Sequence, residues 1–158
     1  MTLGSVLPIA NETSAAAQKE LLEFALLNAD AVIQNPDEPP RMWRVIGRPL
    51  QRALVIAAAR KGILYPSVRD AYAITGVLPF NPAKKYSAVV VEHKTALRSI
   101  FLGAPDILLR HATRIYGLRT QAGGSLTLAD RKALIRRLDE MAYRGERVIG
   151  VGVKESRL

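Results

Sequence analysis

The chain of 158 residues contains no cysteine, only two histidines and no long apolar run. The missing cysteine excludes a disulfide framework, a thiolate zinc site and catalysis by a cysteine nucleophile. The longest apolar runs, such as Ala53–Ala59, fall far short of the roughly 20 residues that span a bilayer. No basic region precedes an apolar block at the N-terminus, so no signal peptide is expected. These absences favour a soluble, cytosolic protein.

The sequence also lacks the short motifs of common enzyme classes. His93 and His111 stand far apart, without a neighbouring pair of carboxylates. There is no Gly-x-x-x-x-Gly-Lys phosphate loop, no Gly-x-Gly-x-x-Gly after a strand and no Gly-x-Ser-x-Gly elbow. We therefore expect no catalytic residue and no metal site from these residues alone.

The overall composition is typical of one globular domain. Hydrophobic residues make up 49% and charged residues 23% of a chain that is long enough to bury a core. The net charge of +9 points to an anionic partner, which leaves nucleic acid, an acidic membrane and a small polyphosphate open. The basic residues are dispersed along the chain rather than gathered in one block, and a solvated surface also explains such a pattern.

Proline, glycine and capping residues predict where four helices begin and end. The expected helices run from Ser14 to about Ala29, from Pro49 to Lys61, from Pro105 to about Thr113, and from Thr127 to Gly145. Thr127 and Asp130 have the spacing of a capping box. Apolar residues at helical spacing mark a buried face in the first helix (Leu21, Leu22, Ala25 and Leu26) and in the last (Leu134, Leu138, Met141 and Ala142).

Runs rich in β-branched and aromatic residues predict four strands. These strands are Val77–Phe80, Tyr86–Glu92, Arg98–Leu102 and Val148–Val153. The segment His93–Ala96 is expected to form a hairpin turn, whereas Asn35–Pro40 and Gln121–Ser125 are expected to be loops. Strands in hairpin order, with helices before and after them, predict an α+β fold with a mainly antiparallel sheet flanked by helices, in one domain over residues 1–158.

Four segments, in chain order, carry a resemblance to a known family. They are Gly47–Leu54 (Gly-Arg-Pro-Leu-Gln-Arg-Ala-Leu), Leu78–Val90 (Leu-Pro-Phe-Asn-Pro-Ala-Lys-Lys-Tyr-Ser-Ala-Val-Val), Phe101–Asp106 (Phe-Leu-Gly-Ala-Pro-Asp) and Met141–Val151. The first segment resembles a Gly-Asp-Pro-Thr-Glu-x-Ala-Leu helix start, and the second resembles a Pro-Phe-x-x-x-x-Lys-x-x-Ser-Val-Val strand pair. The third resembles a Val-Lys-Gly-Ala-Pro-Glu segment, and the fourth a Gly-x-Arg-Val-x-Ala-Val strand. All four motifs belong to the nucleotide-binding (N) domain of P-type cation-transporting ATPases. The resemblance extends from about Leu21 to Glu155.

The resemblance implies an ATP-binding domain with Mg-ATP as its ligand. Phe80 would offer a flat face on which adenine stacks, and Lys85 would place a cation at the mouth of the pocket. Gly103 would leave space for the base, and Arg147 would reach the phosphates. Gln51 stands where the family has a glutamate that accepts a hydrogen bond from the adenine amino group.

Without the motifs, these residues have an ordinary structural interpretation. Phe80, beside a proline at a strand end, would be a core residue. Lys84 and Lys85 would form a solvated hairpin edge that discourages further pairing. Gly103 would be a turn residue, and Arg147 a surface cation.

Three positions depart from the family pattern. Arg48 replaces an aspartate and reverses the local charge, Gln51 keeps an acceptor without its charge, and Leu102 replaces a lysine of the pocket with an apolar side chain. Losing one such contact costs on the order of 1–3 kcal/mol, so we expect weaker nucleotide binding than in a typical pump. One alternative is a degenerate module of the same fold, with weak or no nucleotide binding, that acts in protein–protein contacts. Another, suggested by the charge alone, is a nucleic-acid-binding module.

The resemblance also implies a longer parent protein that hydrolyses ATP to move a cation. The chain lacks the family's Asp-Lys-Thr-Gly-Thr loop and its membrane helices, so alone it can neither phosphorylate itself nor move an ion. We expect an excised domain, monomeric in isolation, whose residues 1–13 connect to the phosphorylation domain. Its expected partners are ATP and the phosphorylation and actuator domains of the parent, with membrane contact only through the parent and no nucleic acid. The motifs leave the transported ion open between proton pumps and calcium-type pumps.

Overall fold

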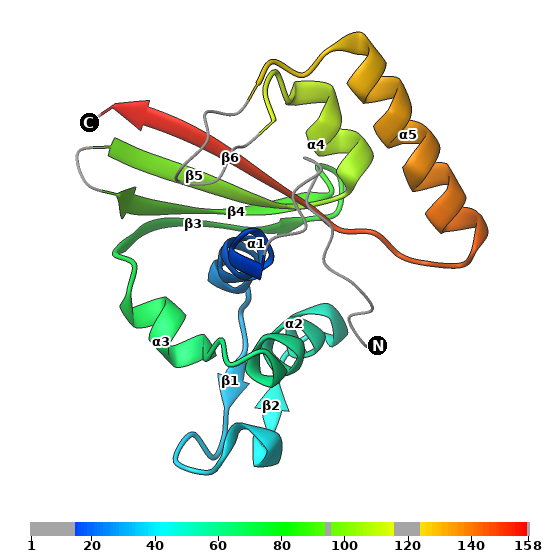
Figure 1. Ribbon diagram of the computed structural model, residues 1–158. Coiled ribbons are helices and arrows are strands. Elements are labelled where there is room, and N and C mark those ends of the chain that lie inside the picture. Colours follow the sequence, from blue (N-terminus) through cyan, green and yellow to red (C-terminus); the bar gives the residue numbers. More distant parts are fainter. Residues whose placement is uncertain (1–14, 94–95, 116–123, 158) are drawn as a thin grey trace.

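The computed structural model describes residues 15–93, 96–115 and 124–157, and the structural statements below concern these ranges. A four-stranded antiparallel sheet forms the centre, with helices on both of its faces (Figure 1). This architecture confirms the expected α+β fold with helices flanking an antiparallel sheet. The predicted connecting segment, residues 1–13, and the predicted helix cap, Ser14, lie outside the described residues.

The strand order in the sheet is β3-β4-β5-β6, so each strand pairs with the strand that follows it in the chain. The strands are β3 (Ile74–Asn81), β4 (Tyr86–His93), β5 (Ala96–Gly103) and β6 (Gly150–Arg157). β4 and β5 pair without a break from Tyr86 and Gly103 to His93 and Ala96, as expected for a hairpin. Residues 94 and 95 of the predicted turn are not among the described residues.

The last strand was predicted wrongly at both ends. It begins at Gly150 rather than Val148, and it continues to Arg157 rather than ending at Val153. It pairs with the whole of β5, from Gly103 and Gly150 to Ala96 and Arg157. The length of the partner strand therefore determines where β6 begins and ends, and polar residues such as Lys154 gave no strand signal of their own.

One face of the sheet carries the core, because side chains alternate between the two faces of each strand. On this face Val89, Val91, Ile100 and Leu102 are at most 6% exposed. They belong to one apolar cluster with residues of α1 (Ala15–Leu27), α2 (Pro49–Arg60) and α3 (Tyr65–Asp70). These three helices lie on the same side of the sheet (Figure 1).

Two of the predicted helix stops, Gly62 and Gly145, agree with the backbone geometry, whereas α1 and the helix Pro105–His111 each end two residues before their predicted ends. α2 begins at Pro49 and ends at Arg60, and Gly62 follows with a φ of 75°. Gly145, after the last helix, has a φ of 76°. Glycine adopts this left-handed conformation without steric cost, so it ends a helix at low cost. α3, which was not predicted, is a helix of six residues and is too short to give a periodic signal.

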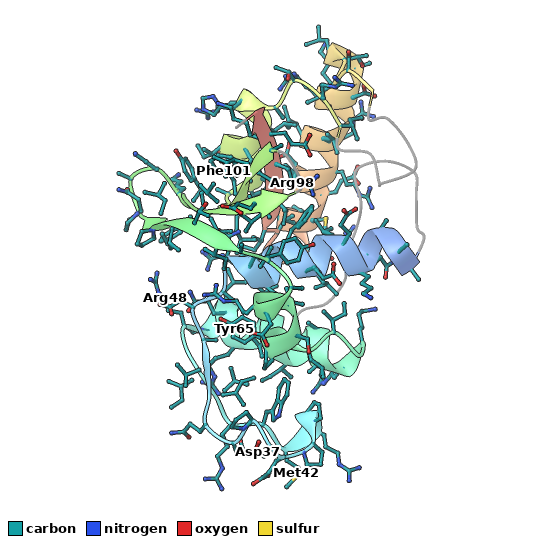
Figure 2. All side chains as sticks on the ribbon, turned by 90° about the vertical axis from the view of Figure 1, so that its left-hand side faces the viewer. Asp37, Met42, Arg48, Tyr65, Arg98 and Phe101 are labelled. Carbon is teal, nitrogen blue, oxygen red and sulfur yellow. The ribbon has the colours of Figure 1, made fainter. Side chains whose placement is uncertain are left out.

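A small lobe projects from the helical side of the molecule. It contains the antiparallel pair β1 (Val32–Ile33) and β2 (Val45–Ile46) and the short 3-10 helix η1 (Pro40–Met42). Asp37 and Met42 lie at its tip, far from the sheet (Figure 2). Neither short strand was predicted, and Pro40, which was expected in a loop, is the first residue of η1, a position that suits proline.

On the opposite face of the sheet α4 (Pro105–His111) lies against β5 and β6, and α5 (Leu128–Tyr143) lies beyond α4 (Figure 1). α5 has no fully buried residue, so its predicted buried face is only partly correct. Leu134, Leu138 and Met141 are half-buried, whereas Ala142 is exposed. The guanidinium of Arg131 donates hydrogen bonds to the carbonyl oxygens of Leu109 and Ala112 and so ties α5 to the end of α4. None of the helices in the described part of the chain is long and apolar enough to cross a membrane.

Candidate functional site

Three of the residues singled out by the motifs, Phe80, Lys85 and Gly103, lie at one end of the sheet. A continuous row of paired residues crosses this end, made of Asn81, Tyr86, Gly103 and Gly150. We call it the terminal row. Phe80 immediately precedes Asn81, and Lys85 immediately precedes Tyr86. The antiparallel pairing therefore brings together Phe80 of β3, Lys85 of the turn before β4 and Gly103 at the end of β5.

A β-bulge presents Phe80 at the edge of the sheet. Leu78 pairs with Ala88, and Asn81 pairs with Tyr86, so Pro79 and Phe80 together lie opposite the single residue Ser87. A bulge changes the direction of the side chains that it carries. Phe80 is 45% exposed, although the ordinary place for a phenylalanine is the core. It offers an apolar, planar surface to a ligand.

The turn before Lys85 is organised by Asn81. The Asn81 side-chain oxygen Oδ1 accepts hydrogen bonds from the backbone N–H groups of Ala83, at 2.9 Å, and Lys84, at 3.1 Å. The N–H of Lys85 donates to the carbonyl oxygen of Asn81 at 2.7 Å. Lys85 has a φ of 60°, a left-handed conformation that costs a non-glycine residue roughly 1–2 kcal/mol. Such backbone strain at a candidate site supports a functional hypothesis.

Gly103 packs directly against the start of β4. A Cβ atom at this position would lie 2.5 Å from the Cβ and 2.7 Å from the Cα of Tyr86, and closer still to the carbonyl oxygen of Lys85. The same Lys85 oxygen accepts a hydrogen bond from the N–H of Ala104 at 3.0 Å. The chain's own backbone therefore requires glycine at position 103, whereas the motif suggested that the space is needed for the base.

Leu102 and Gln51 have structural contacts of their own. Leu102 is 6% exposed and belongs to the apolar core, so it lies beneath the site rather than on its surface. Gln51, in the first turn of α2, is half-buried, and its Oε1 accepts a hydrogen bond from the backbone N–H of Arg48 at 3.1 Å. That bond occupies one acceptor position of the amide oxygen that was expected to receive the adenine amino group. Arg48 itself is exposed at the start of α2 (Figure 2).

Arg147 is less firmly positioned than the strand residues. It is exposed and lies three residues before Gly150, in the connection between α5 and β6. Its neighbours Arg144 and Glu146 form an ion pair with 2.7 Å between Nε and Oε1. The chain direction brings Arg147 toward the terminal row, but no contact holds it there among the contacts found in the described residues.

The sequence gave no role to Asn81 or Ser87, although both organise this end of the sheet. For Asn81 a signal was present, because an Asn-Pro pair after a strand is typical of a turn. For Ser87 there was none, since its importance comes from the bulge on the neighbouring strand. In the described residues, no group of three or more acidic or histidine side chains is arranged to hold a metal ion.

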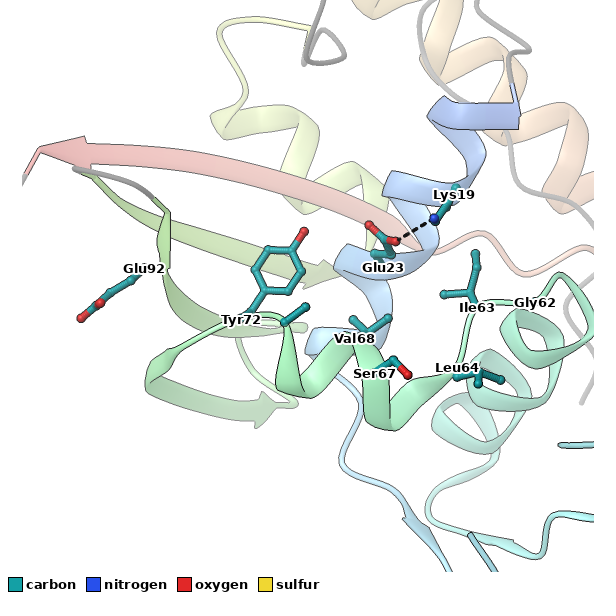
Figure 3. Close-up of a pocket in the computed structure, with 10 residues that line it drawn as sticks. Lys19, Glu23, Gly62, Ile63, Leu64, Ser67, Val68, Tyr72 and Glu92 are labelled. Carbon is teal, nitrogen blue, oxygen red and sulfur yellow. Dashed lines mark ion pairs between the residues drawn. The ribbon is translucent and has the colours of Figure 1, made fainter. Parts of the chain in front are cut away.

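A hollow of about 490 Å³ lies elsewhere, between α1, α3 and the far end of β4 (Figure 3). Ile63, Leu64 and Val68 give it apolar walls, and an ion pair joins Lys19 and Glu23 at 3.8 Å beside it. Its β4 residue is Glu92, six residues beyond Tyr86 and so about 20 Å from the terminal row at the rise of a strand. The hollow is therefore separate from the site that the motifs mark.

Comparison with known proteins covers almost the whole chain. The family model of the P-type ATPase cytoplasmic domain N matches residues 17–157. A calcium-transporting ATPase of Bacillus subtilis is 30% identical over 140 residues, which cover 84% of this chain and 15% of that protein. A probable cation-transporting ATPase F of Mycobacterium tuberculosis is 24% identical over 146 residues, which cover 92% of this chain and 15% of that protein. This chain therefore spans 15% of the length of these curated relatives.

Proposed function

The chain belongs to the family of P-type ATPase cytoplasmic N domains, and on that basis we propose that it binds ATP by its adenine end beside the terminal row. The observation that carries this proposal is the exposure of Phe80. A bulge holds this ring at the sheet edge, 45% exposed, next to the strained turn of Lys85. Adenine stacks on the ring, an interaction worth roughly 1–3 kcal/mol per base.

The remaining residues have distinct roles in this proposal. Lys85 supplies a cation at the mouth of the site, where its ammonium group attracts the phosphates. Gly103 allows the backbones of β4 and β5 to approach closely beneath the base, which supports a flat floor. Arg147 meets the phosphates when ATP is bound, and its guanidinium is suited to bidentate contact with them. Gln51 uses the second acceptor position of its amide oxygen for the adenine amino group, and Leu102 supports the floor from below.

At the scale of the parent protein, we propose that the chain is one domain of a cation-transporting ATPase in the cytosol. The names of the relatives, a calcium-transporting and a probable cation-transporting ATPase, support this proposal. The domain holds Mg-ATP so that the phosphorylation domain of the parent receives the γ-phosphate, and it also meets the actuator domain. These partners lie in the part of the parent that this chain does not cover.

Three local features favour a second candidate function. The Gln51 oxygen already has a backbone partner, Leu102 is buried, and Arg48 places a positive charge at the start of α2. A domain that has lost nucleotide binding and serves in protein–protein contacts would show the same features. Nucleotide titration distinguishes the two functions.

The test is a titration of the isotope-labelled chain with ATP, ADP, adenosine and tripolyphosphate, followed by NMR. We expect ATP to shift the amides around Phe80, Lys85 and Gly103, and adenosine to shift those around Phe80. Phe80→Ala should weaken ATP binding by roughly five- to a hundredfold, the factor that corresponds to one stacked base. Leu78→Ala is the matched control, because Leu78 lies on the same strand and is 40% exposed. No shift at millimolar ATP would refute the proposal and favour the protein–protein alternative.

A further inference from the structure

Asn28 is a polar residue in the core, immediately after the last residue of α1. It is 9% exposed, and it follows the buried residues Leu26 and Leu27. A buried amide costs free energy unless its donors and acceptor are satisfied. Its presence among leucines therefore indicates that its hydrogen bonds serve a purpose that an apolar side chain cannot serve.

The side chain of Asn28 connects three elements. Its Nδ2 donates to the carbonyl oxygen of Ile100 on β5 at 3.1 Å and, within the helix, to that of Phe24 at 3.4 Å. Its Oδ1 accepts a hydrogen bond from the hydroxyl of Ser87 on β4 at 3.2 Å. Since carbonyl oxygens can only accept, the orientation of the amide is determined by these partners.

These bonds hold α1 on the sheet in one position. The apolar contacts of α1 are not directional, so alone they would allow small shifts of the helix along the strands. Hydrogen bonds require a defined distance and angle, and inside a protein they are stronger than in water. The hydrogen bonds of the Asn28 side chain thus connect the end of α1 to both β4 and β5, near the point where these strands reach the terminal row.

Ser87 connects this arrangement to the candidate site. It pairs with Leu102, and it is the single residue opposite the bulge that contains Phe80. Its hydroxyl also lies 3.4 Å from the carbonyl oxygen of Leu102, the residue before Gly103. Lys85 is two residues before Ser87. The hydrogen-bonded pair Asn28–Ser87 therefore neighbours the proposed site, because Ser87 lies opposite the Phe80 bulge, two residues after Lys85 and paired with the residue before Gly103.

Building on the proposed ATP site, we propose that Asn28 and Ser87 are positioning residues for nucleotide binding. The pair holds the start of β4 against β5 and α1, so that the Phe80 bulge and the Lys85 turn have their binding geometry before the nucleotide arrives. Neither side chain contacts the nucleotide. Preorganisation of this kind increases affinity because the ligand does not have to order the site.

Three variants test the hydrogen bond between the Ser87 hydroxyl and the Asn28 side chain. Ser87→Ala removes the hydroxyl, and Ser87→Thr keeps it with a β-branched side chain that suits a strand. Asn28→Ala removes the partner amide. Thr75→Ala is the matched control, because it also removes a hydroxyl that donates a hydrogen bond, in this case to the carbonyl oxygen of Val90 on β4 at 3.4 Å, at the other end of β3.

Two measurements are made on the full 158-residue chain and its variants. The first is amide hydrogen exchange without nucleotide, read at Lys85 and Ala104, whose N–H groups donate to Asn81 and Lys85. The second is the dissociation constant of ATP by calorimetry, well below the melting temperature of each variant. For Ser87→Ala and Asn28→Ala we expect exchange at these two amides and the ATP dissociation constant to rise about three- to tenfold, which corresponds to the loss of one buried hydrogen bond. Ser87→Thr should restore both values, and Thr75→Ala should change neither.

The outcomes separate this inference from the proposed function. If the wild-type chain binds ATP and Ser87→Ala binds it equally well, the positioning role is wrong while the proposed function stands. If exchange rises equally over the whole sheet, the pair is merely structural and the inference is again wrong. If the wild-type chain does not bind ATP at millimolar concentration, the proposed function itself fails, and the positioning role for nucleotide falls with it.

Discussion

At the scale of single residues, Gly103 is the glycine, among those in the described residues, where an added Cβ would meet the closest neighbours. Its Cα lies against the backbone of Lys85 and Tyr86, so an added methyl group would meet backbone atoms that cannot rotate away. Gly152, on the next strand, differs in this respect, because a Cβ there would meet its nearest atom at 3.8 Å, an ordinary contact distance. Substitutions at these two glycines therefore distinguish the steric requirement at Gly103 from the general effect of replacing a glycine in a strand.

We expect Gly103→Ala to destabilise the fold by about 1–3 kcal/mol, the usual cost of forcing extra volume into a packed region. It should also weaken ATP binding, because the added methyl group would press against the backbone of Lys85, a residue of the proposed site. Gly152→Ala, the control, should leave both properties within about 0.5 kcal/mol of wild type. Urea unfolding and ATP calorimetry measure these effects. Equal stability of the two variants would contradict the steric role assigned to Gly103.

At the scale of elements, α5 combines modest packing with a complete cap at its N-terminus. No residue of this helix is fully buried, whereas its N-terminus has a complete capping box. The Thr127 hydroxyl accepts from the N–H of Asp130 at 3.1 Å, and the Asp130 carboxylate accepts from the Thr127 N–H at 2.9 Å. The hydrogen bond from the Thr127 side chain, then that from its backbone, lowers the pKa of Asp130 below its ordinary value of 3.8.

This lowered pKa predicts how α5 responds to acid. Because the carboxylate is favoured in the folded helix, its stabilisation is complete above pH 3.8 and is lost as the pH falls through the lowered pKa. Thr127→Ala should raise the pKa of Asp130 toward its ordinary value and should speed amide exchange in the first turn of α5. An NMR titration of the Asp130 carboxyl group measures the pKa. Ser125→Ala serves as the control, and an unchanged titration of Asp130 in Thr127→Ala would show that the cap does not act as described.

Elements with a local signal were predicted well, and those that depend on a partner were not. Pro49 and Gly62 define α2 from residues within or next to the helix, and the structure agrees within one residue. β6 was predicted two residues too early and four residues too short, because β5 determines its extent. The face of α5 that includes Ala142 was predicted from spacing alone, and spacing does not say whether another element covers it.

At the scale of the whole molecule, the basic residues that give the charge of +9 are dispersed along the chain rather than gathered in one block. The cations assigned to the nucleotide are only Lys85 and Arg147. A ligand held mainly by stacking and by two cations releases few counterions, unlike a nucleic acid held by many phosphate contacts.

We therefore expect the ATP affinity to fall by less than about tenfold between 50 and 200 mM salt, whereas a protein with 6–10 phosphate contacts loses roughly 10³–10⁵ over this range. Calorimetry at several salt concentrations measures how steeply the ATP affinity depends on salt. The comparison ligand is a single-stranded DNA of about 20 nucleotides, long enough to fill about one to five typical single-strand binding sites. Tight, steeply salt-dependent binding of the DNA would contradict the proposed role and favour a nucleic-acid-binding module.

The sequence by itself determined the extent of α2 to within one residue, the β4–β5 hairpin and the family, because these follow from neighbouring residues or from motifs in order. It also marked Phe80, Lys85 and Gly103. Only the tertiary structure decided what surrounds them: that a bulge opposite Ser87 exposes Phe80, that Leu102 lies in the core, and that Gly103 has to accommodate the backbone of β4. The physical reason is that pairing register and burial join residues distant in the chain, as the bond from Ser87 to Asn28 does across 59 positions.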